Sequence, residues 1–141
     1  LIATKSEIPI TQRKLLENFF MDKKIVIQEG VAMPNSLINK YYENSAVVWN
    51  AYNRSMQSGV LPKSYMFGTP VITCVKNNNE FIDNYKTGVS LNDNDNNEEI
   101  FNATATILAN LKKYSASARK KFLEIFYYKN HINTFKYIIK K

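Results

Sequence analysis

A polar stretch between two apolar runs holds the residues of this chain that are best suited to bind an anion. It follows the strand-like run 46–49 and reaches into a short helix that is predicted to end at Gly68. Backbone N–H groups at the start of a helix converge on one point, and the helix dipole favours negative charge there. The residues that could take part are Arg54, Ser55, Gln57, Ser58, Gly59, Val60 and Lys63.

Each of these residues also has an ordinary structural explanation. Ser58 is predicted to be the helix N-cap, because its hydroxyl can accept from the Leu61 amide, and Gly59 would let a ligand approach the backbone closely. Arg54 and Lys63 can pair with phosphate or a sugar, but Arg54 could equally be a solvated loop residue. A diphosphate cradle and a plain capped helix therefore both fit this stretch.

A carboxylate, Glu80, follows the next predicted strand, 71–75, after a polar turn. It could bind sugar hydroxyls at the carboxyl edge of a sheet, where ligands of open α/β proteins lie. It could also be the acid that favours the start of a helix, which we expect over residues 80–85. The side chains expected to face inward from that helix are Phe81, Ile82 and Tyr85.

Catalysis by cysteine, histidine or a bound metal has little support in the sequence. Cys74 is the only cysteine and His131 the only histidine, so a His/Cys metal cluster is excluded and a nucleophilic triad is improbable. Cys74 lies in an apolar run and is expected to be a buried small hydrophobe.

The Asn/Asp-rich run 92–97 does not match a calcium loop. Counted from Asp93, position six is Glu98 instead of glycine, and position twelve is Thr104 instead of glutamate. The calcium interpretation therefore fails, and no metal ion or other cofactor is expected at this run.

Strand-like and helical segments alternate along the chain, which predicts βαβ units, a mainly parallel sheet and right-handed crossovers. Strands are expected at 1–4, 25–29, 46–49, 71–75 and 88–91. Helices are expected at 10–20, from Pro34 to about 42, at 58–67, 80–85 and 98–111, and again from Ser115. A terminal segment carries Ile132, Phe135, Ile138 and Ile139.

The net charge of +7 is concentrated in the last part of the chain. Residues 111–141 carry nine lysines or arginines and one glutamate, a net charge of +8, whereas residues 1–110 carry −1. Aromatic side chains are interleaved with these charges. Three interpretations compete: a solvated helix face whose apolar side packs on the domain, a surface for anionic lipid, and a nucleic-acid patch. No nucleic-acid motif accompanies the charge, so we expect no nucleic-acid partner.

The 141 residues suit one domain of ordinary soluble composition, and no apolar run approaches the roughly 20 residues of a membrane span. A cytoplasmic protein, peripheral at the inner membrane face if its basic helices bind lipid, is the expectation. The chain begins without methionine, inside an apparent strand, which indicates a fragment of a longer chain.

The order of these elements resembles the C-terminal, donor-binding domain of GT-B glycosyltransferases, in the retaining group called glycosyl transferases group 1. The residues that carry the resemblance, over about residues 25–130, are Gly59, Gly68-Thr69-Pro70-Val71-Ile72, Glu80-Phe81-Ile82 and Gly88. Each piece is weak alone, and their order and spacing carry the resemblance.

The resemblance implies a Rossmann-like fold over residues 1–141, lacking its first elements and ending in basic helices at 115–141. Such a domain holds a nucleotide-diphospho-sugar, while an N-terminal domain of the parent chain holds the glycan or lipid-linked acceptor, as in polysaccharide biosynthesis. It implies a metal-independent hexosyltransferase in which helix N-termini and basic side chains neutralise the diphosphate. This half alone would be inactive, and no catalytic residue can be named in it.

One departure separates this chain from that family. The family has two glutamates eight positions apart, which contact the sugar and the ribose, and here those positions hold Ser55 and Lys63. A divergent subgroup in which Arg54, Gln57 or Lys63 supplies the contacts is the preferred explanation. The alternative is a non-catalytic Rossmann-like interaction or regulatory domain that has lost donor binding.

Overall fold

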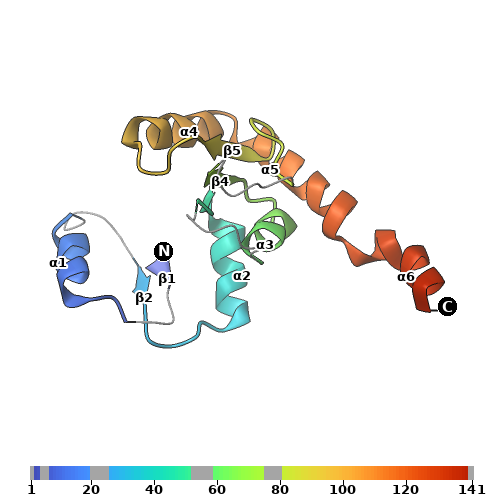
Figure 1. Cartoon of the computed structure of the whole chain (residues 1–141), viewed down its shortest axis with the longest axis horizontal. Helices are drawn as coiled ribbons and strands as arrows, with labels where there is room; N and C mark the ends of the chain where they lie inside the picture. The colour runs from blue at the N-terminus through green and yellow to red at the C-terminus, as the bar shows by residue number, and fades with distance from the viewer. Residues whose placement is uncertain (1, 4–6, 20–25, 52–58, 75–80, 140–141) are drawn as a thin grey trace. The chain divides into compact units, whose positions relative to one another are not determined.

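The structure is a computed structural model, and it describes residues 2–3, 7–19, 26–51, 59–74 and 81–139. The chain forms two compact units, Leu1–Tyr41 and Tyr42–Lys141 (Figure 1). We describe each unit by itself.

The first unit contains a pair of short parallel strands. Strand β1 (Ile2–Ala3) pairs with β2 (Ile27–Gln28), and helix α1 (Ile10–Phe19) lies between them in sequence. The Glu29 carboxylate accepts from the backbone N–H of Ile8 at 2.6 Å and pairs with Arg13 of α1. The apolar residues of α1 have helical spacing and the segment is a helix. Its apolar side is not fully buried, however, since Leu15 is exposed.

Helix α2 (Asn35–Asn44) begins after Pro34, as predicted, and ends in the second unit. The Pro34 carbonyl accepts from the N–H groups of Leu37 and Ile38 at 3.0 Å each, so the proline lies just before the first helical turn. A proline fits there because its missing N–H would have no partner inside the helix.

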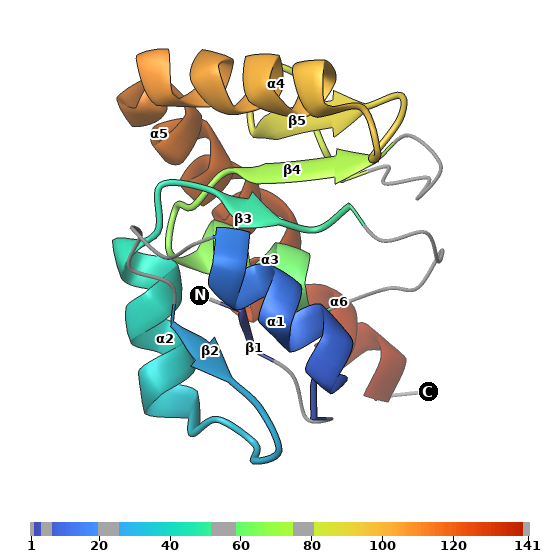
Figure 2. The ribbon, with the colours of Figure 1, turned by 90° about the vertical axis from the view of Figure 1, so that its left-hand side faces the viewer.

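The second unit is built on a three-stranded parallel sheet. Its strands are β3 (Val48–Trp49), β4 (Val71–Cys74) and β5 (Gly88–Leu91), and they lie side by side in that order. Val71 pairs with Val48 on one side and with Gly88 on the other. The three arrows in Figure 2 accordingly point to one edge of the sheet. The prediction of a parallel α/β sheet flanked by helices is confirmed for these strands.

Helix α3 (Val60–Met66) connects β3 to β4 and completes a βαβ unit. Its N-cap position is held by Gly59 without a side-chain cap, so the prediction of Ser58 as the N-cap is wrong by one residue. Gly68 follows the end of the helix with φ +71°, which is the left-handed conformation predicted for a glycine at a helix end. The Ser64 hydroxyl donates to the Thr69 carbonyl at 2.7 Å and fixes the turn into β4.

Strand β4 is buried on both faces because helices cover both. Ile72 and Cys74 face a cluster formed with Val89, Leu91 and residues of α4 (Asn97–Ala109) and α5 (Leu111–Lys121). Val71 faces a second cluster with α3 and η2 (Phe122–Phe126). Helices α4 and α3 thus lie on opposite sides of β4 (Figures 1 and 2). The expected burial of Cys74 is confirmed.

Three local predictions are wrong. No helix begins at the described residues 81–85, where the chain forms turns and Tyr85 is 62% exposed. Helix α5 begins at Leu111, not at Ser115. The apolar spacing of the expected helix 98–111 predicts that Leu108 faces inward, but Leu108 is half exposed, whereas Ala103 and Ile107 are buried.

The chain ends in η3 (Tyr128–His131) and α6 (Ile132–Ile139). The His131 ring lies 3.0 Å from the Ile125 carbonyl, which gives the single histidine a structural contact. Among the helices of the described residues, none combines the length and apolar character needed to cross a membrane.

Candidate functional site

The three parallel strands have their carboxyl ends on the same side of the sheet, which we call the carboxyl edge. The sequence predicts the anion site at this edge. β3 and β4 end at Trp49 and Cys74, and β5 ends at Leu91. Two contacts define this edge. The Asn94 side-chain amide donates to the Ala51 carbonyl at 3.2 Å, and the Cys74 thiol lies 3.9 Å from the Asn92 carbonyl. The segments that leave β3 and β5 are therefore tied together across the end of β4.

Three of the predicted site residues lie within the described chain, together on the first turn of α3. Gly59 is exposed, while Val60 and Lys63 are partly buried, and the Lys63 N–H donates to the Gly59 carbonyl at 3.2 Å. The others, Arg54, Ser55, Gln57, Ser58 and Glu80, lie outside the described residues.

The environment of Gly59 gives no packing reason for a glycine. Its φ of −62° suits any residue, and among the described residues no atom lies within 4 Å of a Cβ placed on it. At Gly88, by contrast, a Cβ would lie 2.2 Å from the Val71 carbonyl oxygen, so that glycine is required by strand packing. The described packing does not require a glycine at position 59, but a ligand that approaches the backbone closely could require one.

The acidic residues after β5 are used to hold the loop in place. The Glu99 carboxylate accepts from the Asn92 N–H at 2.7 Å and from the Asp93 N–H at 3.0 Å, and it also accepts from the Asn92 side chain at 3.0 Å. These hydrogen bonds to the charged form hold the pKa of Glu99 below its ordinary value. Asn96 caps α4 by accepting from the Glu98 and Glu99 N–H groups. Glu99 is therefore a structural acceptor and not a general base.

A buried tyrosine joins α3 to the turn before β5. The Tyr65 hydroxyl donates to Thr87 Oγ1 at 2.7 Å, and Thr87 Oγ1 accepts from the Asp83 N–H at 3.0 Å. Burial raises the pKa of Tyr65 far above its ordinary value, so the phenol stays neutral. Asp83 also pairs with Lys121, whose Nζ lies 3.0 Å from both carboxylate oxygens, which anchors α5 to this turn.

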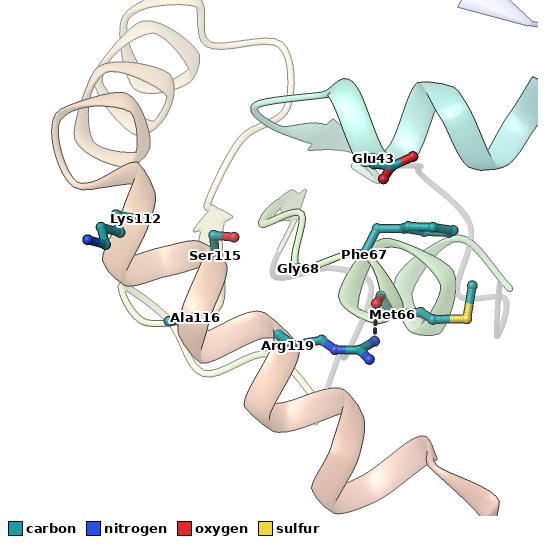
Figure 3. A pocket seen from close by; sticks show the side chains of 8 residues that line it. All are labelled: Glu43, Met66, Phe67, Gly68, Lys112, Ser115, Ala116 and Arg119. Atoms are coloured by element: carbon teal, nitrogen blue, oxygen red, sulfur yellow. Dashed lines mark hydrogen bonds between the residues drawn. The ribbon is translucent and has the colours of Figure 1, made fainter.

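Two hollows lie outside the predicted site. One, of about 530 Å³, is lined by residues of α5 and by the end of α3, with Glu43 nearby (Figure 3). Gly68 and Glu43 precede β4 and β3, which places this hollow at the amino ends of the strands. In it Arg119 donates to the Met66 carbonyl and lies 5.3 Å from the centre of the Phe122 ring. Arg119 therefore satisfies the carboxyl end of α3, which gives it a structural role.

The other hollow, of about 480 Å³, lies beside the outer edge of β5 and α4. Its walls include Tyr85, Asn92 and Asn102. The edge of β5 there is already paired, because the Tyr85 N–H donates to the Gly88 carbonyl at 2.8 Å and the Ser90 N–H donates to Asn84 Oδ1 at 3.0 Å. These bonds leave little of the strand edge open to pairing with another chain.

Sequence reasoning missed Asn94 as a residue that ties the site edge together, because its partner, Ala51, is 43 positions away. The Asn/Asp-rich composition of 92–97 marked the loop but not this contact. Within the described ranges, no three His, Cys, Asp or Glu side chains gather as a metal ion would require.

No protein-family model matches the chain, and no match is found among curated proteins or solved structures. The sequence resemblance and the site geometry are therefore the basis of any functional conclusion.

Proposed function

We propose that this chain is the donor-binding domain of a glycosyltransferase, which holds a nucleotide-diphospho-sugar at the carboxyl edge of the sheet. The observation that carries this proposal is the parallel unit β3–α3–β4, with the segment 50–59 leading from a strand end into a helix. Ligands of open α/β sheets lie outside such strand ends.

The chemistry of the described residues supports an anionic ligand at this edge. Lys63 is the fourth of the seven residues of α3, so its ammonium can reach a phosphate near the start of that helix. Gly59 leaves open space beside the backbone. Arg54 and Gln57 would add side-chain contacts in place of the family's glutamates.

The proposed enzyme is a Rossmann-like GT-B protein, and its acceptor domain would be another part of the parent chain. It would transfer a hexose to a glycan or lipid-linked acceptor. The donor's phosphates would be neutralised by protein groups, without a metal ion.

Calorimetric titration of the chain with UDP, GDP and CDP, at low and moderate salt, tests this proposal. We expect saturable binding of one nucleotide, weakened about 10-fold by Lys63→Ala, because a hydrogen bond to a charged group contributes about 1.5 kcal/mol. Arg54→Ala should have a similar effect. Lys112→Ala is the matched control, since Lys112 is an exposed lysine at the opposite edge of the sheet.

Gly59→Ala separates ligand approach from folding. The added methyl meets no described atom, so the stability should change by less than about 0.5 kcal/mol, whereas nucleotide affinity should fall. Absence of binding by all three nucleotides, or equal affinity of the Arg54 and Lys63 variants and the wild type, would contradict the donor site.

A non-catalytic interaction domain is the second candidate function. It is favoured by two exposed apolar side chains on one side of α4, Phe101 at 71% and Leu108 at 50% exposure, seven residues apart. This candidate predicts a silent nucleotide titration. It also predicts a protein partner whose binding is lost with Phe101→Ser and Leu108→Ser.

A further inference from the structure

Helix α6 presents apolar side chains to solvent instead of packing them on the domain. Ile132 is 42% exposed and Ile138 is 62% exposed. A docked apolar face, one of the three interpretations of the basic C-terminus, would have buried these isoleucines.

Lysines border this apolar side. Lys129 of η3 and Lys136 of α6 are exposed and lie seven residues apart. Glu124 pairs with Lys120 at 3.7 Å, and residues 125–141 contain no Asp or Glu side chain that could neutralise these lysines. The segment therefore combines an uncovered apolar side with uncompensated positive charge.

Two exposed tyrosines belong to the same terminal segment, Tyr128 in η3 and Tyr137 in α6. Tyr128 is 60% exposed and Tyr137 is 65% exposed. Tyrosine has an apolar ring and a polar hydroxyl, and it is enriched at the boundary between lipid and water. A helix with this composition, too short to span a bilayer, is suited to lie in the plane of the interface.

We propose that α6 docks on an anionic lipid surface, with Ile132 and Ile138 inserted among the acyl chains and Lys129 and Lys136 against the headgroups. The charge decides the occupant, because residues 125–141 carry four lysines and no aspartate or glutamate, a charge that is complementary to acidic headgroups. A nucleic acid would satisfy the lysines but would leave the isoleucines in water. This surface is independent of the nucleotide site, and it would hold a domain that acts on lipid-linked acceptors at the membrane.

Vesicle flotation of the full 141-residue chain tests the proposal. Vesicles of phosphatidylcholine alone are compared with vesicles containing phosphatidylglycerol, at low and high salt. We expect binding only to the anionic vesicles, weakened by salt. Lys129→Gln with Lys136→Gln should lower the partition coefficient about 30-fold, since each lysine near such a surface contributes about five-fold.

Ile132→Ser with Ile138→Ser should lower the partition coefficient by about 10-fold or more, because lipid burial of each side chain is lost. Two controls match these variants. Phe101→Ser with Leu108→Ser removes two exposed apolar groups from α4, and Lys112→Gln with Lys113→Gln removes two exposed charges from α5. Both controls should bind within about two-fold of wild type, because effects on screened, distant charges are small.

Three results would overturn the proposal. The first is equal binding to neutral and anionic vesicles at both salt concentrations. The second is unchanged binding of both α6 variants, with their helical circular dichroism intact. The third is tight binding to a duplex oligonucleotide that falls with the lysine variant but not with the isoleucine variant, which would assign the surface to nucleic acid.

Discussion

Replacement of Gly88 by alanine tests the pairing of β4 and β5 on which the site edge depends. Gly88 pairs with Val71, and a Cβ on Gly88 would lie 2.2 Å from the Val71 carbonyl oxygen and 2.9 Å from Val71 Cγ2. The closest atom belongs to the backbone, so no rotamer change can relieve the contact. The two strands would have to separate.

The size of that separation sets the expected loss of stability. A carbon and a carbonyl oxygen approach no closer than about 3.3 Å even in favourable contacts, so the strands must move apart by about 1 Å. Overpacking of a core costs about 1–3 kcal/mol, and weakening of one or two ladder hydrogen bonds adds about 1 kcal/mol each. We expect Gly88→Ala to lower the free energy of unfolding by about 2–5 kcal/mol.

Urea unfolding followed by the fluorescence of Trp49 measures this loss. Trp49 is the only tryptophan, and it lies in β3, next to β4, so it reports on the sheet itself. With an m-value of about 2 kcal/mol per M, the midpoint should fall by about 1–2.5 M.

The other glycines of this unit give a graded comparison. Gly68→Ala should cost about 1–2 kcal/mol, because φ is +71° and the new Cβ would meet Ser115 Oγ at 3.1 Å. Gly59→Ala should change stability by less than about 0.5 kcal/mol. A loss below about 1 kcal/mol for Gly88→Ala, or equal losses at all three glycines, would refute the register of the sheet.

Three further predictions concern polar contacts. Tyr65→Phe should lower the free energy of unfolding by about 1–2 kcal/mol in a denaturant titration, because Thr87 Oγ1 loses a buried donor; an unchanged midpoint would contradict the contact. Glu99→Gln should lower the free energy of unfolding at pH 7. The difference in stability from wild type should shrink as the pH falls below 4.5, the ordinary pKa of a glutamate, and through the lower folded pKa of Glu99, because protonation removes the same charge from wild type. A difference that does not change with pH would count against this role of Glu99. A double-mutant cycle of Lys121→Met and Asp83→Asn, measured as free energies of unfolding, should show a coupling energy of about 0.5–1 kcal/mol that shrinks in 1 M salt. Additive effects of the two substitutions would mean that the ion pair does not stabilise the fold.

The limits of sequence prediction are visible in the turn before β5. Phe81, Ile82 and Tyr85 have helical spacing, but the chain adopts turns there and Tyr85 has φ +60°. Phe81 and Ile82 pack against the second core cluster, and Asp83 and Thr87 are held by Lys121 and Tyr65, which come from other helices. Contacts over 22 and 38 positions thus override a local pattern of five residues.

The start of α5 is a second place where tertiary packing overrides a local sequence pattern. Serine is a residue type that often begins a helix, which predicts a helix start at Ser115, but α5 begins at Leu111 and continues through Ser115. Tyr114 and Ala118 are four residues apart and both buried, so one continuous helix face is required across the serine. That requirement exists only once α5 is packed on the sheet.

The sequence by itself determined the alternation of strands and helices, the left-handed end of α3 at Gly68 and the burial of Cys74, because each follows from local sterics and apolar spacing. It also located the +8 segment and the polar stretch before α3, since charge and composition need no fold to be counted. Tertiary structure decided which carboxylates serve as structural acceptors, which glycine is required by packing and which side of α6 meets solvent. Those outcomes depend on how separate segments pack together, as Gly88 does against Val71, and such packing leaves no local pattern in the chain.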